Sequence, residues 1–453
     1  MRVPALIAAA VVAVVANLLL ILRLTFLPWV EQSTANSVDA PAGQLAVAGL
    51  AAPVSVRRDA YGVPLIEAQS VEDLSFAAGY VMAQDRYNQM IGMTLSAQGR
   101  LAEMAGPVAL PMDRYMRTLG VRRIAEAHYR QLTPELQTAL ARFSAGVNAW
   151  AGAHRDRLPL SLRLSGYVPE DWAPMNSMDI YMLLNLGLAL NLHQEIDFLN
   201  IAAQVGADNA AWLLPTMPDE PLPFTEARKI AGADLAALRP QAAELAQLQD
   251  ALQTQLLPTG IAASNNWVIA PQRTAAHASI LANDTHLLLE HPPMWMLLQL
   301  RAPGYNATGV AVAGVPGIVA GYNGHIAWGM TMVMADGQDL FVERLRDNGG
   351  KEEYLAGATW LPVSEREETL RVRGSAAVEH LKVRATRHGP LVESALREAR
   401  LNPIQPVPLA SQSSSGLALS WTATEPDSSM AALWALARAE NIAQAQVAVR
   451  DVR

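Results

Sequence analysis

The chain has 453 residues, of which 51% are hydrophobic and 17% charged, a composition that excludes an intrinsically disordered protein. The net charge of −8 at pH 7, without any long Lys/Arg tract, argues against nucleic acid as a partner. Cysteine is absent, so disulfides, zinc–thiolate sites and a cysteine nucleophile are excluded.

Residues 1–30 are predicted to direct the chain to a membrane. After Arg2, an apolar run extends over residues 3–22 and is interrupted only by Pro4 and Asn17. The core of a signal peptide usually has about 7–15 residues and a spanning helix needs about 20, so this length favours an uncleaved anchor. A cleaved signal peptide and a buried helix of a soluble protein are the alternatives. Either of the first two predicts a periplasmic or otherwise extracytoplasmic protein.

The remainder divides by composition. Residues 31–49, rich in Ser, Ala, Gly and Asp, indicate a tether, and residues 50–232 are predicted to be largely helical after two short strands. Residues 233–263 are rich in Ala, Gln and Leu without any aromatic side chain, and we interpret them as a helical spacer rather than core. Strands dominate from Ser264 onward. The last helical pattern stops at Arg453 without a capping glycine, which suggests part of a longer protein.

A hairpin is predicted immediately after the spacer. Residues 265–270 and 278–283 both have strand-like patterns, and the segment between them is rich in turn-forming residues. If the two strands pair symmetrically, Ser264 lies opposite Asp284, because cross-strand register follows from spacing. Side chains alternate along a strand, so His286 would share the face of Asp284 and approach Ser264. An ordinary hairpin with a polar end is the alternative interpretation.

Ser264 is the candidate nucleophile. A serine hydroxyl needs a base, and a free α-amine titrates at about 7.7–8.0, so a serine at a chain terminus carries its own base. The small residues Ala262 and Ala263 precede it. Attack of the hydroxyl on the Ala263 carbonyl, followed by hydrolysis of the resulting ester, would release a chain that begins at Ser264. The predicted activating step is therefore cleavage of the Ala263–Ser264 bond.

From about Val54 to Arg453 the sequence resembles the penicillin acylase family of N-terminal-nucleophile hydrolases, which includes penicillin, cephalosporin and acyl-homoserine-lactone acylases. The most specific motifs, in chain order, are residues 264–267, 283–286, 314–317, 321–329 and 336–340. Upstream, the motifs resembling the family's α chain are residues 58–64, 84–86, 99–103, 146–149 and 166–172. No single motif is decisive, but their common order makes the resemblance specific.

The resemblance implies an α+β protein with an αββα four-layer sandwich. It implies self-cleavage into an α chain, here residues 50–232, and a β chain whose N-terminal part is residues 264–453. The cleaved enzyme would hydrolyse the amide of an N-acylated small molecule, such as a β-lactam side chain or an acyl-homoserine lactone, through an acyl-enzyme on Ser264. The alternative is a non-processing, membrane-tethered relative that binds acylated ligands without turnover.

The resemblance also implies residues around the nucleophile. His286, 22 positions after Ser264 (286 − 264), matches a histidine that hydrogen-bonds near the nucleophile in cephalosporin and homoserine-lactone acylases. A structural histidine at a strand end is the alternative. Met332 and Val333 match the family's backbone oxyanion donor, a group that holds developing negative charge. The second oxyanion donor, an asparagine side chain, is expected beyond Arg453.

A calcium site is implied by the same resemblance. Asp336 and Asp339 match the family's calcium loop, Gln338 would offer its backbone carbonyl, and Glu195 matches the ligand from the α chain. Calcium takes several hard oxygen ligands, so this donor set suits it. A solvated acidic turn is the alternative. No organic cofactor is implied.

Four positions match the acyl pocket of penicillin G acylase: Leu287, Val319, Ala320 and Met330. Leu287 and Ala320 stand where that enzyme has aromatic side chains, which favours an aliphatic acyl chain over a phenylacetyl ring. Ordinary core positions are the alternative interpretation.

Overall fold

The computed structural model describes residues 2–38, 42–189, 191–211, 233–252, 263–287, 289–332, 335–396, 414–450 and 452. The helices are α1 (Arg2–Ile21), α2 (Leu27–Asn36), α3 (Val71–Gln98), α4 (Ala102–Ala105), α5 (Leu110–Leu119), α6 (Val121–Gln131), α7 (Pro134–Ala153), α8 (Leu160–Ser165), α9 (Pro174–Leu188), α10 (Leu192–Val205), α11 (Ala207–Ala211), α13 (Leu235–Ala251), α14 (Glu393–Leu396), α15 (Ser429–Leu436) and α16 (Ile442–Ala448). The strands are β1 (Ser55–Arg58), β2 (Pro64–Glu67), β3 (Ser264–Ile269), β4 (Ile280–Thr285), β5 (Trp295–Ala302), β6 (Tyr305–Val312), β7 (Ala320–Tyr322), β8 (Ala327–Trp328), β9 (Gln338–Asp347), β10 (Glu352–Ala356), β11 (Thr359–Pro362), β12 (Ser364–Leu370), β13 (Glu379–Ala385) and β14 (Ser415–Trp421). This mixture of helix and sheet agrees with the expected α+β class.

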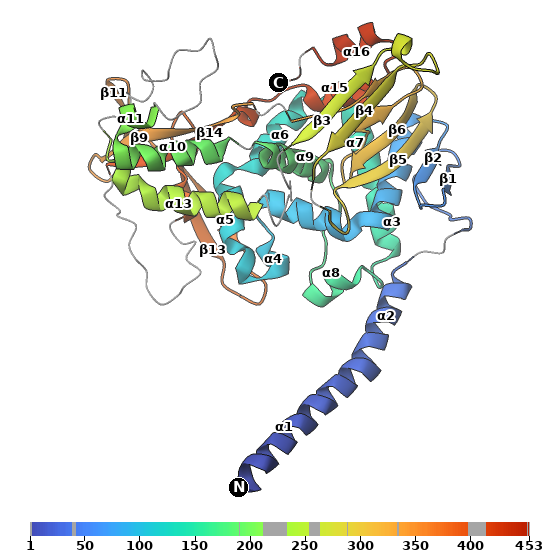
Figure 1. The fold of residues 1–453 in the computed structure, drawn as a ribbon, viewed down its shortest axis with the longest axis horizontal. Coiled ribbons are helices and arrows are strands. Elements are labelled where there is room, and N and C mark those ends of the chain that lie inside the picture. The colour runs from blue at the N-terminus through green and yellow to red at the C-terminus, as the bar shows by residue number, and fades with distance from the viewer. Residues whose placement is uncertain are drawn as a thin grey trace.

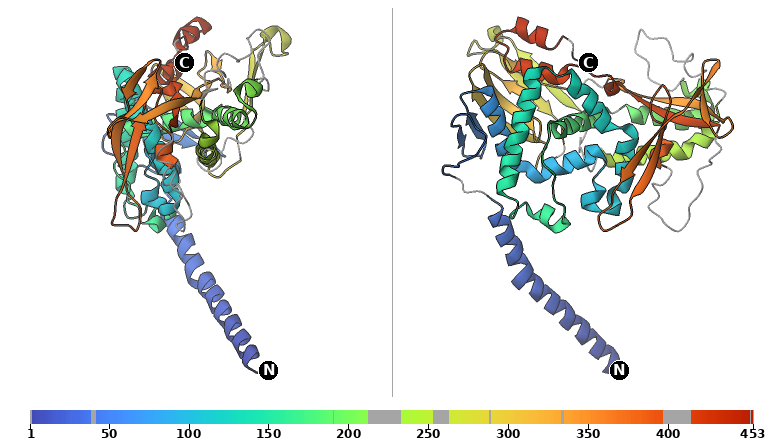
Figure 2. Two further views of the ribbon diagram at one scale, coloured as in Figure 1. Left: turned by 90° about the vertical axis from the view of Figure 1, so that its left-hand side faces the viewer. Right: turned by 180° about the vertical axis from the view of Figure 1, so that it is seen from behind.

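The N-terminal helix projects from the body of the protein. α1 and α2 are joined by a π-helical turn over Leu22–Phe26 into one rod that extends away from the remaining elements in every view (Figures 1 and 2). Within it, Ala10–Ala35 spans 26 residues, and its most apolar window of 18 residues has a mean hydropathy of 2.4 and no buried share. This helix is long and apolar enough to cross a membrane, as an anchor requires, and a signal sequence meets the same criterion.

One sheet combines strands from residues 50–232, the predicted α chain, with strands from residues 264–453, the predicted β chain. The six-stranded sheet has the order β1-β2-β5-β6-β7-β8. Strands β2 and β5 pair in parallel, and every other pair of neighbouring strands in this sheet is antiparallel. The side chains add to this pairing, since Arg301 lies 3.0 Å from Glu67. If the chain is cut before Ser264, the two products therefore remain joined by the backbone hydrogen bonds of this sheet.

Two glycines bring α3 and α7 together against one face of this sheet (Figures 1 and 2). A Cβ on Gly146 of α7 would lie 1.8 Å from the carbonyl oxygen of Phe76, and one on Gly79 of α3 would lie 2.1 Å from that of Phe143. Because both obstacles are backbone atoms, an added methyl group can be accommodated only if the helices separate. The glycines thus set the distance between the two central helices.

Gly146→Ala is expected to destabilise the chain by about 3 kcal/mol, because the helices must separate. Gly152→Ala is the matched control on the same helix, since nothing lies within 4 Å of its added Cβ. That control should gain up to about 1 kcal/mol from helix propensity. Urea unfolding of both variants checks the prediction, and equal stability of the two would contradict the close approach.

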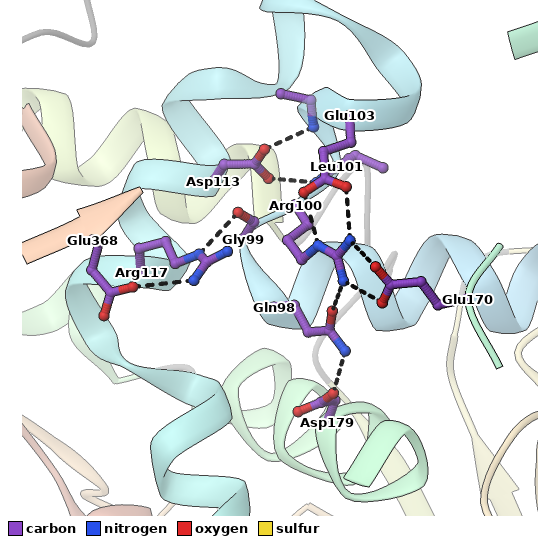
Figure 3. Close-up of polar contacts among 11 residues, drawn as sticks. Gln98, Gly99, Arg100, Leu101, Glu103, Asp113, Arg117, Glu170, Asp179 and Glu368 are labelled. Carbon is purple, nitrogen blue, oxygen red and sulfur yellow. Dashed lines mark hydrogen bonds and ion pairs between the residues drawn. The ribbon is translucent and has the colours of Figure 1, made fainter. Parts of the chain in front are cut away.

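A polar network fixes the end of α3 against α9 and the loop before it (Figure 3). Gln98 donates to the buried Asp179 of α9 at 2.8 Å, and Arg100 makes a two-point contact with Glu170 at 2.9 and 3.0 Å. On the other side, Asp113 of α5 accepts the first two backbone amides around α4 at 2.7 and 2.8 Å. Burial raises the pKa of Asp113 to about 7. The network holds α9, which leads into α10.

α13 corrects one expectation. It lies in the stretch interpreted as spacer rather than core, yet its apolar residues belong to the main hydrophobic cluster: Leu235, Leu238, Ala242, Leu245 and Leu248. Their spacing of three and four residues forms one apolar stripe, which packs on α10. The absence of aromatic side chains therefore did not exclude a core role. Removal of residues 233–263 as a spacer stays a prediction.

The remaining strands form three smaller sheets. β11-β10-β9-β14 lies at the end of the molecule occupied by α10 and α13, while β12-β13 and β3-β4 are two-stranded (Figure 1). β3 is mostly exposed along its length. The four-layer αββα sandwich is not established by the described residues.

Candidate functional site

The register of the β3–β4 hairpin differs from the expected one by one residue. Ser264 pairs with Thr285, and Asn265 pairs with Asp284. Partners in a ladder share a face, and a shift of one residue exchanges the faces. Consistently, His286 Nε2 lies 3.0 Å from Asp284 Oδ2 and 3.3 Å from Asn265 Nδ2. The expectation that spacing places the side chains of Asp284 and His286 on the face of Ser264 is therefore wrong.

The cause lies in the connection between the strands. It contains a 3₁₀ turn over Pro271–Arg273 and a left-handed His277 with φ of 51°. Thr274 closes the loop, because its hydroxyl contacts the Ala278 carbonyl oxygen at 2.8 Å. Such a loop is not symmetric about one residue, so counting from its centre gives the strands but misses the register by one.

His286 reaches the predicted cleavage site through its main chain. Its backbone N–H donates to the carbonyl oxygen of Ala263 at 3.2 Å. A donor on a carbonyl oxygen draws electron density from the carbonyl carbon and favours attack there. The contact concerns the bond that would be broken, between Ala263 and Ser264.

A second backbone amide faces Ser264 itself. The N–H of Met332 donates to Ser264 Oγ at 3.0 Å, across 68 positions of sequence. Val333, the other predicted donor, lies outside the described residues. The hydroxyl oxygen of Ser264 and the Met332 N–H are thus in direct contact, and their roles as nucleophile and oxyanion donor stay predictions.

Asn283 and Gly329, for which the sequence suggested no individual role, hold the Met332 segment in place. Asn283 Nδ2 donates to the carbonyls of Asn265 and Met330 at 3.0 and 2.8 Å, and its Oδ1 accepts the Met330 N–H at 3.0 Å. A Cβ on Gly329 would lie 2.8 Å from Cβ of Asn283. The bare glycine therefore lets the segment approach the hairpin closely enough for these bonds.

The predicted pocket positions lie in two places. Leu287 follows the hairpin, with its N–H bonded to the Thr285 carbonyl, and Met330 is held beside the hairpin by Asn283. Val319 and Ala320 lie at the start of β7, where Val319 packs against the main core. Their arrangement into one acyl pocket stays a prediction.

Three carboxylates gather where α10 meets the start of β9. Glu195, Asp336 and Asp339 each offer one oxygen, and these oxygens lie within 4.8 Å of one another. Burial and then neighbouring carboxylates raise the pKa of both Glu195 and Asp339. Within the described ranges, no Arg or Lys side chain offsets these shifts in the pKa of Glu195 and Asp339. Clustered anionic oxygens with a nearby carbonyl, that of Gln338, fit a hard divalent cation such as calcium.

Asn191, at the start of α10, also belongs to this cluster and is not singled out by the sequence. Its Nδ2 lies 2.5 Å from Asp336 Oδ1 and 2.5 Å from the Gln338 carbonyl oxygen. In the sequence, Asn191 is an asparagine that directly precedes a helix, a pattern that ordinarily indicates a helix cap.

Comparison with known proteins assigns the chain to a family. Residues 53–453 match the family described as penicillin amidase, and the chain belongs to that family. It is 48% identical over 427 residues to acyl-homoserine lactone acylase QuiP of Pseudomonas aeruginosa, covering 94% of this chain and 50% of that protein. It is 34% identical to penicillin acylase 2 proenzyme of Pseudomonas sp. (strain SE83), covering 77% of this chain and 45% of that protein.

The chain spans about half the length of the curated relatives it matches. Among solved structures, thermostable penicillin G acylase from Alcaligenes faecalis aligns with a TM-score of 0.32 and 20% identity over 41% of this chain and 30% of that chain. That likeness is too low to establish a common fold by itself.

Proposed function

We propose that this chain belongs to a self-processing amidohydrolase that cleaves the amide bond of an N-acylated small molecule through an acyl-enzyme on Ser264. Family membership supports amide hydrolysis. The observation that carries the proposal is a pair of backbone donors at one peptide bond. The His286 N–H contacts the Ala263 carbonyl oxygen, and the Met332 N–H contacts Ser264 Oγ.

Self-cleavage begins with attack of Ser264 Oγ on the carbonyl carbon of Ala263. The carbonyl oxygen becomes an oxyanion, which the His286 N–H stabilises. The C–N bond breaks, the nitrogen of Ser264 takes the hydroxyl proton and leaves as an amine, and an ester joins the two residues. Water then hydrolyses the ester, giving a carboxylate on Ala263 and a free α-amine on Ser264.

Turnover uses the amine that cleavage creates. It removes the hydroxyl proton of Ser264 as Oγ attacks the substrate's amide carbonyl, and the Met332 N–H, together with that of Val333, holds the oxyanion. The leaving amine takes the proton, and water then releases the acyl group from Ser264. The α-amine titrates at about 7.7–8.0 in an unperturbed chain, so a neutral fraction is available near pH 7.5.

The proposed substrate is an amide with an aliphatic acyl chain. Similarity to proteins named acyl-homoserine lactone acylases is higher than to the penicillin acylase 2 proenzyme. The pocket positions Leu287, Val319, Ala320 and Met330 carry aliphatic side chains, which suit an alkyl tail better than they suit stacking on an aromatic ring.

The remaining proposals concern architecture and location. Residues 50–232 and 264–453 would form an α chain and the first part of a β chain in a four-layer αββα sandwich. A structural calcium ion would be held by Glu195, Asp336, Gln338 and Asp339. The apolar helix Ala10–Ala35 supports an extracytoplasmic enzyme anchored at the membrane by its N-terminus.

The test is a panel of N-acyl-homoserine lactones of increasing chain length and phenylacetylated β-lactams, assayed with the full-length protein for release of the free amine. We expect kcat/KM for the best alkyl amide to exceed that for phenylacetyl amides by at least about tenfold, the order of discrimination that an apolar pocket supplies. An uncut protein that binds acylated ligands and releases no amine from any of them would contradict the proposal.

A further inference from the structure

Asn191 links α10 to the loop that begins β9, 145 to 147 positions further along the chain. Its Nδ2 donates to Asp336 Oδ1 and to the Gln338 carbonyl oxygen, each at 2.5 Å. Its Oδ1 accepts the backbone N–H groups of Gly337 at 3.2 Å and of Gln338 at 3.1 Å. A primary amide has two N–H bonds and two oxygen lone pairs, so this loop engages all four.

The side chain of Asn191 forms its hydrogen bonds with the loop rather than with its own helix. An asparagine before the first turn of a helix usually accepts a hydrogen bond from that turn, but Asn191 makes no such bond to α10. The loop, in turn, carries Asp336 and Asp339, which face the carboxylate of Glu195. Asn191 therefore orders a segment in which like charges oppose a close approach.

The amide nitrogen of Asn191 contacts two oxygens that a bound cation would also use. Calcium lies about 2.3–2.6 Å from its oxygen ligands. Asn191 Nδ2 lies 2.5 Å from both Asp336 Oδ1 and the Gln338 carbonyl oxygen, so it approaches these two acceptors as closely as such an ion would. The amide nitrogen and the ion would therefore compete for the same two oxygens.

We infer that Asn191 is a clasp that competes with a divalent cation for the loop of residues 336–338. The inference rests on the proposed cation site. The amide holds the loop against α10 through four hydrogen bonds, and the cation must displace its nitrogen from two of the oxygens. Asn191 therefore weakens cation binding, while it lessens the dependence of the folded chain on the cation.

Calcium titration calorimetry and thermal unfolding, in EDTA and in saturating calcium, test the clasp on the full chain. Asn191→Ala should lower Tm in EDTA and bind calcium at least about tenfold more tightly, because nothing has to be displaced; tenfold corresponds to about 1.4 kcal/mol. Asn191→Asp replaces the donor with a fourth carboxylate, so it should show the largest rise in Tm on calcium addition. Asn209→Ala is the control, because among the described residues Asn209 donates to the Val205 carbonyl in its own neighbourhood and to no residue of the 336–338 loop.

Three results would overturn the clasp. The first is a wild-type Tm of Asn191→Ala in EDTA, and the second is a calcium affinity of that variant equal to or weaker than that of the wild type. The third is that none of the four proteins (the wild type and the three variants) binds calcium. Turnover is not measured, and cleavage of the same samples at Ser264 is scored on a denaturing gel. Cleaved chains with an unchanged calcium response would refute the clasp and leave the hydrolase proposal standing.

Discussion

Ser264→Ala should leave the chain uncut and lower amide hydrolysis on the order of 10⁶-fold. The substitution removes the only oxygen that the proposed cleavage and the proposed turnover share. The expected readouts are a single band on a denaturing gel and no release of amine above background. Ser161→Ala, at an exposed serine of α8 that contacts Asn88, should cleave and turn over normally.

Ser264→Cys adds a second arm to this prediction. A thiol is a competent nucleophile for acyl transfer, so partial cleavage at the same bond is expected. Cleavage of Ser264→Ala between residues 263 and 264 at the wild-type rate would contradict self-processing, since the chain would then be cut without its own nucleophile.

Asn283→Ala is the second large effect that we expect, with a loss of kcat of about 10²–10³-fold and a smaller change in KM. Three hydrogen bonds from this side chain hold the Met330 backbone and the hairpin together, and Met332 lies two residues further on. Without them the Met332 N–H moves away from Ser264 Oγ, and loss of one oxyanion donor costs a factor of that size. Self-cleavage should slow as well, because Ser264 Oγ loses its fixed position.

Gly329→Ala should reproduce this phenotype from the opposite side, since its Cβ would press on Asn283 at 2.8 Å. Gly152→Ala and Asn348→Ala serve as controls; Asn348 lies on an exposed turn and contacts Glu353. The measurement is kcat and KM, determined separately, in variants whose Tm equals that of the wild type. A variant of Asn283 with wild-type kcat, or one whose loss follows its Tm alone, would show that the Met332 amide is not positioned in this way.

The sequence predicted the hairpin and the helical first region because each depends on short-range patterns. The acidic cluster joins Glu195 to Asp336 and Asp339 across a long stretch of sequence, and only the family resemblance indicated it. Strand periodicity located β3 and β4, but the register depends on the conformation of the connecting loop, where His277 adopts a positive φ that no periodicity reveals. A shift of one residue in the pairing of β3 with β4 was enough to place His286 on the face of Asn265 instead of that of Ser264.

Other features escaped prediction because they depend on contacts between distant parts of the chain. α13 has the composition of a spacer, and only its packing on α10 shows that its leucines are buried. Asn191 looks like a helix cap until the loop at Asp336 is seen beside it. Asn283 belongs to a recognisable motif, but its bonds to Met330 cross 47 positions of sequence. In each case a partner distant in sequence, which the local pattern does not reveal, determines the role of the residue.

The central claim is that the bond before Ser264 is broken by the chain itself. Intact-mass analysis with N-terminal sequencing of the purified wild-type protein tests it most directly. The account predicts two chains that remain associated under native conditions, one of them beginning Ser-Asn-Asn-Trp. A single chain that keeps the Ala263–Ser264 bond after prolonged incubation would contradict it.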